Sequence, residues 1–295
     1  MKFSKITLGT VQFGLNYGIA NTDGKPSYEK ARDIVATACE NGITSFDTAA
    51  AYGDSEKVLG RIFQELKLKD KVKVVSKVAP VKELDLSAIE AEKLITESVE
   101  TSLERLGIDQ LAACLFHCEE DFEYIDILRK LEARGLIAGS GVSLDSTTYC
   151  EQILKNDIKF LQVPYNILDK RFDSFWSKAE SANITIFTRS VYLQGLLLMP
   201  EENIIPHLQS VIPVRRELEN IVKDSDMDMI ELCMRYVLCN SAITSVLTGV
   251  DSSKQLKQNI KLFNKGPLSD NLLMKVRKIV PEFPENIIRP VYWPK

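Results

Sequence analysis

The sequence has little of several features that would set a class of function. Its six cysteines form no CxxC pair and no dense framework, so they predict reduced thiols rather than a disulfide scaffold. No apolar run approaches the roughly 20 residues that a membrane span needs, and the first residues do not resemble a signal peptide. The net charge of -4 lacks the basic excess of a nucleic-acid surface. We therefore expect a cytoplasmic protein with neither a membrane nor a nucleic acid as partner.

Short apolar runs and helical patterns alternate along the chain. This order predicts a parallel sheet with right-handed crossovers. Eight units favour closure into a (β/α)8 TIM barrel, although the strand count alone also fits an open doubly wound sheet. Strands are predicted over residues 6–10, 43–47, 73–77, 111–117, 138–143, 160–163, 184–188 and 245–249, and helices over 28–40, 55–66, 86–106, 122–134, 147–154 and 253–263.

Two long connections and an extra helix interrupt or follow this alternation. Polar residues 12–27 follow the first strand, and residues 193–213 follow the seventh. Long loops of this kind are usually functional, and in a barrel both would cover the catalytic mouth. An extra C-terminal helix is predicted over residues 269–280, ending before Pro281. No linker is visible, so we expect a single domain over residues 1–295.

Oppositely charged side chains end two neighbouring predicted strands. Asp47 closes the second strand and Lys77 closes the third. A buried charge is costly unless it is paired, and neighbouring strand ends lie side by side in a barrel. We therefore expect an Asp47–Lys77 ion pair. On its own, this pair fits a structural role at the barrel rim as well as a catalytic role.

Tyr52 favours the catalytic interpretation. It follows the second strand on a loop that ends in Gly53, where a nearby lysine would lower the phenol pKa from its reference of about 10. Such a phenol is a usable general acid. His117 ends the fourth strand and would point into the same cleft, whereas His207 has no such context. Beside His117 and Cys118 no cluster supplies further ligands, so no metal is predicted.

Segments spread over nearly the whole chain resemble the aldo-keto reductase family. The most specific is FDTAAAYGDSEKVLG, which carries Asp47 and Tyr52, and it is preceded by LGTVQFG. VVSKV and LFH carry Lys77 and His117. The segments GVS, QVPYN, RSVYLQGLL and LTGVDSSKQLKQN resemble the later strand ends of the family. The resemblance implies a barrel that binds NADPH or NADH and transfers a hydride to a small-molecule aldehyde or ketone.

The resemblance also implies roles for individual residues. Tyr52 would protonate the forming alkoxide, Lys77 held by Asp47 would lower the Tyr52 pKa, and His117 would orient the carbonyl oxygen. Ser143 and Gln162 would bind the nicotinamide carboxamide. The residues implied in cofactor binding are Ser143, Gln162, Arg189, Ser190, Leu193, Gly195, Gly249, Asp251, Ser252, Gln255 and Asn259.

This chain departs from the family pattern in three places. Leu144 stands where the family often has an Asn that helps to hold the carboxamide. Arg189 replaces a residue, often aromatic, that packs against the nicotinamide ring; its planar guanidinium can stack but brings charge beside the hydride donor. The basic residues that commonly hold the 2′-phosphate of NADPH are replaced around Asp251, with only Lys254 nearby. We therefore expect NADH to be at least tolerated.

The substrate is predicted only by class. The opening LGTVQFGLNYGIAN looks like family members associated with bacterial sugar and cell-surface polysaccharide metabolism, which favours a sugar-type carbonyl. Candidate substrate-binding walls are Phe13, Tyr17, Tyr192, Tyr292 and Trp293. Two other functions compete: a Schiff-base lyase that uses Lys77, and a non-catalytic, cofactor-sensing barrel. The sequence predicts no oligomeric state.

Overall fold

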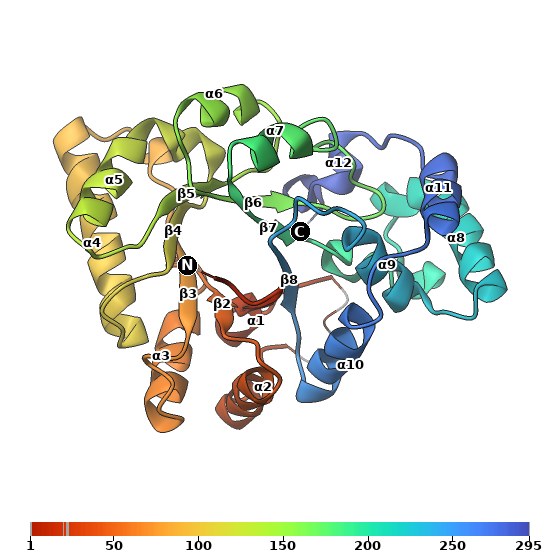
Figure 1. The fold of residues 1–295 in the computed structure, drawn as a ribbon, viewed down its shortest axis with the longest axis horizontal. Coiled ribbons are helices and arrows are strands. Elements are labelled where there is room, and N and C mark those ends of the chain that lie inside the picture. The colour runs from red at the N-terminus through yellow and green to blue at the C-terminus, as the bar shows by residue number, and fades with distance from the viewer. Residues whose placement is uncertain (1, 20, 22–23, 295) are drawn as a thin grey trace.

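Eight parallel strands close into a barrel in chain order, with helices around it, in the computed structural model, which describes residues 2–19, 21 and 24–294 (Figure 1). The strands are β1 (Ile6–Gly9), β2 (Ser45–Asp47), β3 (Lys73–Val78), β4 (Ala113–Phe116), β5 (Ser140–Ser143), β6 (Phe160–Pro164), β7 (Thr185–Arg189) and β8 (Ser245–Gly249). Pairing of β1 with both β2 and β8 closes the sheet. The predicted (β/α)8 barrel is confirmed, and the open sheet is excluded.

Helices follow the strands around the barrel. They are α1 (Val11–Gly14), α2 (Tyr28–Glu40), α3 (Ser55–Glu65), α4 (Ala88–Leu106), α5 (Ile125–Ala133), α6 (Cys150–Lys155), α7 (Trp176–Ser181), α8 (Ile212–Asp224), α9 (Met229–Val237), α10 (Ser253–Phe263), α11 (Asp270–Ile279) and α12 (Glu285–Ile288). Within the described residues no helix is long and apolar enough to cross a membrane. Of the loop predicted over residues 12–27, residues 20, 22 and 23 lie outside the described part of the chain.

The inside of the barrel is divided into an apolar floor and a polar top. The floor is a separate buried cluster of Phe3, Val75, Ala112, Ala113, Leu115, Phe160 and Phe187. The Phe3 ring closes it from below, edge-on to Phe160 and Phe187 at centroid distances of 5.6 and 5.0 Å. Successive side chains of a strand alternate faces. Residues two positions beyond these floor residues, such as Lys77 and Gln162, therefore line the top of the same interior.

Candidate active site

A buried ion pair joins the carboxyl ends of β2 and β3. The Lys77 Nζ donates to both carboxylate oxygens of Asp47, at 2.7 and 2.8 Å, and to the Thr48 carbonyl at 3.0 Å. Gln162 on β6 donates its amide to Asp47 at 2.7 Å. The side chains of Lys77 and Asp47 are 1% and 3% exposed. The ion pair predicted from the strand ends is therefore present, and three hydrogen bonds compensate the buried carboxylate.

Tyr52 lies beside this pair on the loop that connects β2 to α3. The loop continues the sheet hydrogen bonding, since the backbone N–H of Ala50 donates to the Lys77 carbonyl at 3.0 Å. It then turns through Gly53, whose φ is +53°. The Lys77 Nζ lies 5.1 Å from the centroid of the Tyr52 ring. A phenol, an ammonium and a carboxylate are thus held together by two adjacent strand ends.

The electrostatics of Tyr52 differ from the expectation. Burial, reinforced by the negative charge of Asp47 and opposed by Arg189, raises the pKa of the Tyr52 phenol above its usual value. The expected lowering of this pKa by Lys77 is therefore wrong for the structure described. The physical reason is that desolvation disfavours the phenolate and that the lysine charge is already bound by Asp47.

His117 completes the group from the residue after β4. Its ring lies edge-on to Tyr52, with centroids 5.5 Å apart and an interplanar angle of 84°. Burial, with the positive charges of Lys77 and Arg189, lowers the pKa of His117 to about 3. Its imidazole is therefore neutral near pH 7, and its buried Nδ1 has no hydrogen-bond partner among the residues that the structure describes. A neutral ring can donate one hydrogen bond to a substrate oxygen.

A cavity of about 310 Å³ opens beside Asp47 and Tyr52 at the carboxyl ends of the strands. It extends over the residues that follow β1, β7 and β8, and Gln162 of β6 also lines it. Twelve residues named in the sequence analysis line it: Tyr17, Asp47, Tyr52, Gln162, Arg189, Ser190, Tyr192, Gly195, Gly249, Asp251, Gln255 and Asn259. The Tyr192 hydroxyl donates to Asn259 at 2.9 Å, so this predicted substrate wall lies with the residues implied for the cofactor.

Other candidates do not line this cavity. Phe13 and Leu193 are fully buried in the hydrophobic core. Trp293 is also buried, and its indole N–H donates to the Ile287 carbonyl at 3.0 Å. Ser252 instead caps α10 by accepting from the Gln255 N–H at 3.3 Å. The expectation that Phe13 and Trp293 form substrate walls is therefore wrong for this cavity, because both aromatic rings are packed in the hydrophobic core.

Ser143 and Tyr292, predicted to bind the cofactor and the substrate, also lie outside the cavity lining. Ser143 is a buried residue at the end of β5, in register with Gln162, and it is not part of the cavity lining. Tyr292 is 51% exposed and lies under the Arg289 guanidinium at 4.9 Å from its ring centroid. Neither therefore faces the described cavity.

The backbone after β7 is strained where it borders the cavity. Ser190, Leu193 and Gln194 have positive φ values of 65°, 47° and 53°. Such conformations in residues other than glycine cost about 1–3 kcal/mol each and cluster at functional sites. Successive residues of this kind also orient backbone N–H groups around anions. Periodicity in the sequence carries no signal of this strain.

Arg189 is anchored by a residue that sequence reasoning missed. Its guanidinium pairs with the Asp145 carboxylate and donates to the Leu144 carbonyl at 3.1 Å. The positive charge of Arg189 lowers the pKa of Asp145, outweighing its partial burial. Asp145 lies two residues beyond the end of β5, so a search for every polar residue just after a strand would have found it.

Comparison with known proteins agrees with this geometry. The model of the Aldo/keto reductase family matches residues 5–281. The chain is 27% identical to L-galactose dehydrogenase from Arabidopsis thaliana, over 88% of this chain and 84% of that protein. It is 25% identical to the NADH-specific methylglyoxal reductase of Escherichia coli K12, over 88% and 93%. The holo form of aldo-keto reductase AKR11C1 from Bacillus halodurans shares the fold, with a TM-score of 0.79, 22% identity and coverage of 95% and 93%.

Proposed function

The chain belongs to the aldo/keto reductase family, an enzyme family that reduces carbonyl groups with NAD(P)H, and from that premise we propose that Tyr52, Lys77, Asp47 and His117 carry the reaction. The observation that supports this most is the buried Asp47–Lys77 pair next to Tyr52 at the wall of a cavity. An ion pair that served only the barrel rim would need no phenol and no neutral imidazole beside it.

The cavity has features that fit a dinucleotide. Gln12 Oε1 and Thr248 Oγ1 are buried and line the cavity, and within the described part of the chain they have no hydrogen-bond partner. A Cβ on Gly249 would lie 2.6 Å from the Gln12 amide, so a larger residue there would displace the end of that side chain. The side chains of Gln12 and Thr248, with those of Gln255 and Asn259, are suited to hold the sugar and phosphate portions of the dinucleotide. When bound, NAD(P)H supplies a hydride to the carbonyl carbon, and its ring thereby gains one positive charge.

In this proposal Tyr52 holds and delivers the proton. Its raised pKa keeps the phenol protonated until the carbonyl oxygen becomes basic during hydride transfer. The O–H bond of Tyr52 then breaks as the new O–H bond of the alcohol forms. The Lys77 ammonium lies 5.1 Å from the centre of the Tyr52 ring, and Asp47 and Gln162 fix the ammonium and its carboxylate partner beside the resulting phenolate. The neutral His117 donates a hydrogen bond that orients the carbonyl oxygen.

For the substrate we propose a polar, sugar-type carbonyl compound. Besides the amides proposed above for the cofactor, Gln194 and Gln258 line the cavity with amide groups that can bind hydroxyl groups. The relative from Arabidopsis is a dehydrogenase named for L-galactose, and this supports the same class. For the cofactor we propose that NADH is accepted, as the name of the Escherichia coli relative states for that enzyme.

Replacing Tyr52 with Phe tests the proposal. The ring and its packing remain while the proton donor is lost, so NAD(P)H should still bind and kcat should fall by about 10²–10⁴-fold. Tyr28→Phe is the matched control, because the Tyr28 hydroxyl bonds to Glu65 on the outer surface. Near-normal turnover by Tyr52→Phe would contradict the assignment. Turnover of the wild type without nicotinamide would favour the lyase, and binding without turnover the sensor.

A further inference from the structure

In the Arg189–Asp145 ion pair, the positive charge lies closer to the cavity than the negative charge. Arg189 lines the cavity wall, whereas Asp145 does not. Burial works against the charged guanidinium, but Asp145 keeps the pKa of Arg189 above its usual value. The pair therefore acts as a fixed dipole whose positive end faces the cavity.

Of the two charges in this pair, that of Arg189 has the larger effect on the pKa values of Tyr52 and His117. Arg189 opposes the rise of the Tyr52 pKa more strongly than Asp145 adds to it. At His117 the guanidinium likewise outweighs the Asp145 carboxylate in lowering the imidazole pKa. The other nearby cation, Lys77, is matched by Asp47 at 2.7 Å. Arg189 thus adds positive charge at both groups: it opposes the negative charge of Asp47 at Tyr52 and adds to the positive charge of Lys77 at His117.

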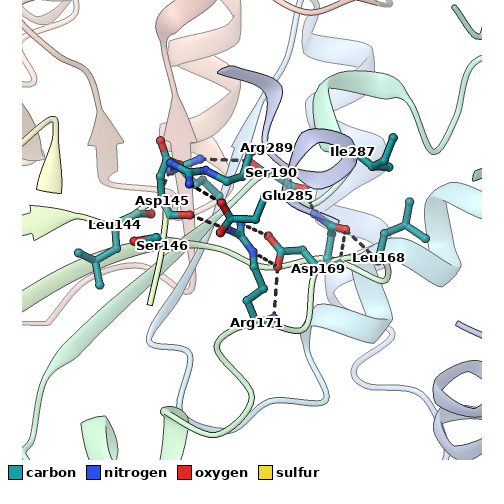
Figure 2. A network of polar contacts seen from close by, with 12 residues as sticks. Leu144, Asp145, Ser146, Leu168, Asp169, Arg171, Ser190, Glu285, Ile287 and Arg289 are labelled. Atoms are coloured by element: carbon teal, nitrogen blue, oxygen red, sulfur yellow. Dashed lines mark hydrogen bonds and ion pairs between the residues drawn. The ribbon is translucent and has the colours of Figure 1, made fainter. Parts of the chain in front are cut away.

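Contacts on three sides hold this dipole in place. The Arg171 guanidinium donates to the Asp145 carbonyl at 2.7 Å and forms an ion pair with Asp169 at 2.7 Å. Arg171 also reaches Glu285 on α12 at 3.3 Å, and Glu285 accepts from Arg289 at 2.9 Å (Figure 2). Loops after β5 and β6 and the C-terminal segment therefore brace the pair. These contacts hold the backbone from which the Asp145 side chain reaches Arg189.

The ring of a bound nicotinamide must come close to this field. Hydride transfer requires the donor carbon roughly 3–3.5 Å from the carbonyl carbon, whose oxygen receives the Tyr52 proton. The reduced ring is neutral and the oxidised ring is a cation. Only the oxidised form is therefore repelled by the positive end of the dipole.

We propose that the Arg189–Asp145 pair sets the redox preference of the cofactor site, making it bind reduced nicotinamide in preference to oxidised nicotinamide. The inference rests on the function proposed above. The pair leaves the overall reaction equilibrium unchanged, as any enzyme must. It speeds the loss of oxidised cofactor after turnover, which suits an enzyme working in the direction of carbonyl reduction.

Dissociation constants of NADH, NAD⁺, NADPH and NADP⁺ for the purified protein and three variants test this proposal. Arg189→Gln removes the positive end of the pair and keeps its negative end, so the ratio of the oxidised to the reduced dissociation constant should fall about tenfold. Asp145→Asn removes the opposing charge and should raise that ratio by a similar factor, about tenfold. Arg189→Lys keeps the charge and should keep the ratio near that of the wild type.

The opposite signs separate this role from simple damage to the site. A purely structural pair would weaken both redox forms equally in both variants, and an unchanged ratio would overturn the inference. Arg216→Gln is the charge-matched control, because Arg216 pairs with Glu201 on the exposed face of α8. Failure of the wild type to bind any of the four nucleotides would instead overturn the proposed function. If Arg189→Gln does not fold, Asp145→Asn alone still decides the sign.

Discussion

At the scale of residues, contacts between side chains on neighbouring strands were easier to predict from the sequence than contacts between side chains on distant strands. Asp47 and Lys77 end adjacent strands, so their pairing follows from the sequence once a parallel sheet is assumed. Asp145 follows β5 and Arg189 ends β7, two strands away around the barrel. Only closure of the barrel interior brings such side chains together, and no local spacing encodes it. The same reason explains why the Gln162–Asp47 hydrogen bond was not foreseen.

The buried imidazole of His117 predicts a pH dependence of stability. Burial, with Lys77 and Arg189, lowers its pKa to about 3, whereas an unfolded histidine titrates near 6.5. Between these values the unfolded chain binds a proton that the folded chain does not, so stability falls as the pH drops. From pH 7 to pH 5 the loss from this group should be at most about 2 kcal/mol.

His117→Asn should remove this contribution. Urea midpoints measured at several pH values should decline less steeply for the variant than for the wild type. The carboxylates contribute to acid sensitivity in both proteins, so the difference between the two curves isolates His117. Parallel curves would show that the imidazole is not held neutral in the folded state.

At the scale of elements, boundaries were predicted best where caps are strong. The predicted bounds of the helices over residues 28–40 and 253–263 are those of α2 and α10. Ser27 accepts from the Lys30 N–H at the start of α2, and Ser87 forms a capping box with Glu90 at the start of α4. Gly107 ends α4 with a left-handed φ of 65°, as its role as a helix stop requires.

Five helices were missed: α1 and α12 have only four residues each, and the other three were missed for identifiable reasons. Pro213 was interpreted as the end of a loop, yet it lies in the first turn of α8, where its missing N–H costs nothing. The next helix, α9, begins after Asp228, whose side chain accepts from the Glu231 N–H. The third, α7, has six residues, too few for a clear helical period.

The short helix α1 predicts a coupling between its own packing and catalysis. A Cβ on Gly14, the last residue of α1, would lie 1.7 Å from the Tyr52 carbonyl oxygen. Gly14→Ala must therefore displace the loop that carries Tyr52, at a cost of about 1–3 kcal/mol in unfolding free energy. We expect kcat to fall as well, because a displacement of about 1 Å near the chemistry can cost about 10²-fold.

Gly42→Ala provides the control for that substitution. Gly42 has nothing within 4 Å of an added Cβ, although its φ is +77°. The variant should lose about 1–2 kcal/mol of stability from backbone strain alone, with kcat unchanged. Wild-type kcat in Gly14→Ala would show that α1 does not position Tyr52.

At the scale of the whole molecule, the barrel brings to one end what the chain separates widely. Residues between Gly9 and Asn259 line one cavity, and the segment after α11 is tied to the same end through Arg171 and Glu285. Order of strands and helices was enough to predict this arrangement, because parallel closure places every carboxyl end on one side. The contents of the long loops were not predictable, since their conformations depend on packing against each other.

Cofactor choice is a property of this assembled surface, and it can be measured through global stability. A ligand at 100 times its dissociation constant stabilises the folded state by about 2.7 kcal/mol, which for a chain of this size raises the melting temperature by about 5 °C. The segment after β8 offers Asp251 and the exposed Lys254, one acid and one base. An extra phosphate with close to two negative charges gains little from such a balance.

We therefore expect NADH and NADPH at equal concentrations to raise the melting temperature by similar amounts. Repeating the measurement at low and high salt separates specific recognition from charge attraction, because salt screens exposed charges. Lys254→Gln should lower the shift caused by NADPH and leave the shift caused by NADH unchanged. A much larger shift with NADPH that shrinks in high salt would reveal a basic clamp for the 2′-phosphate, contradicting acceptance of NADH as an equal cofactor.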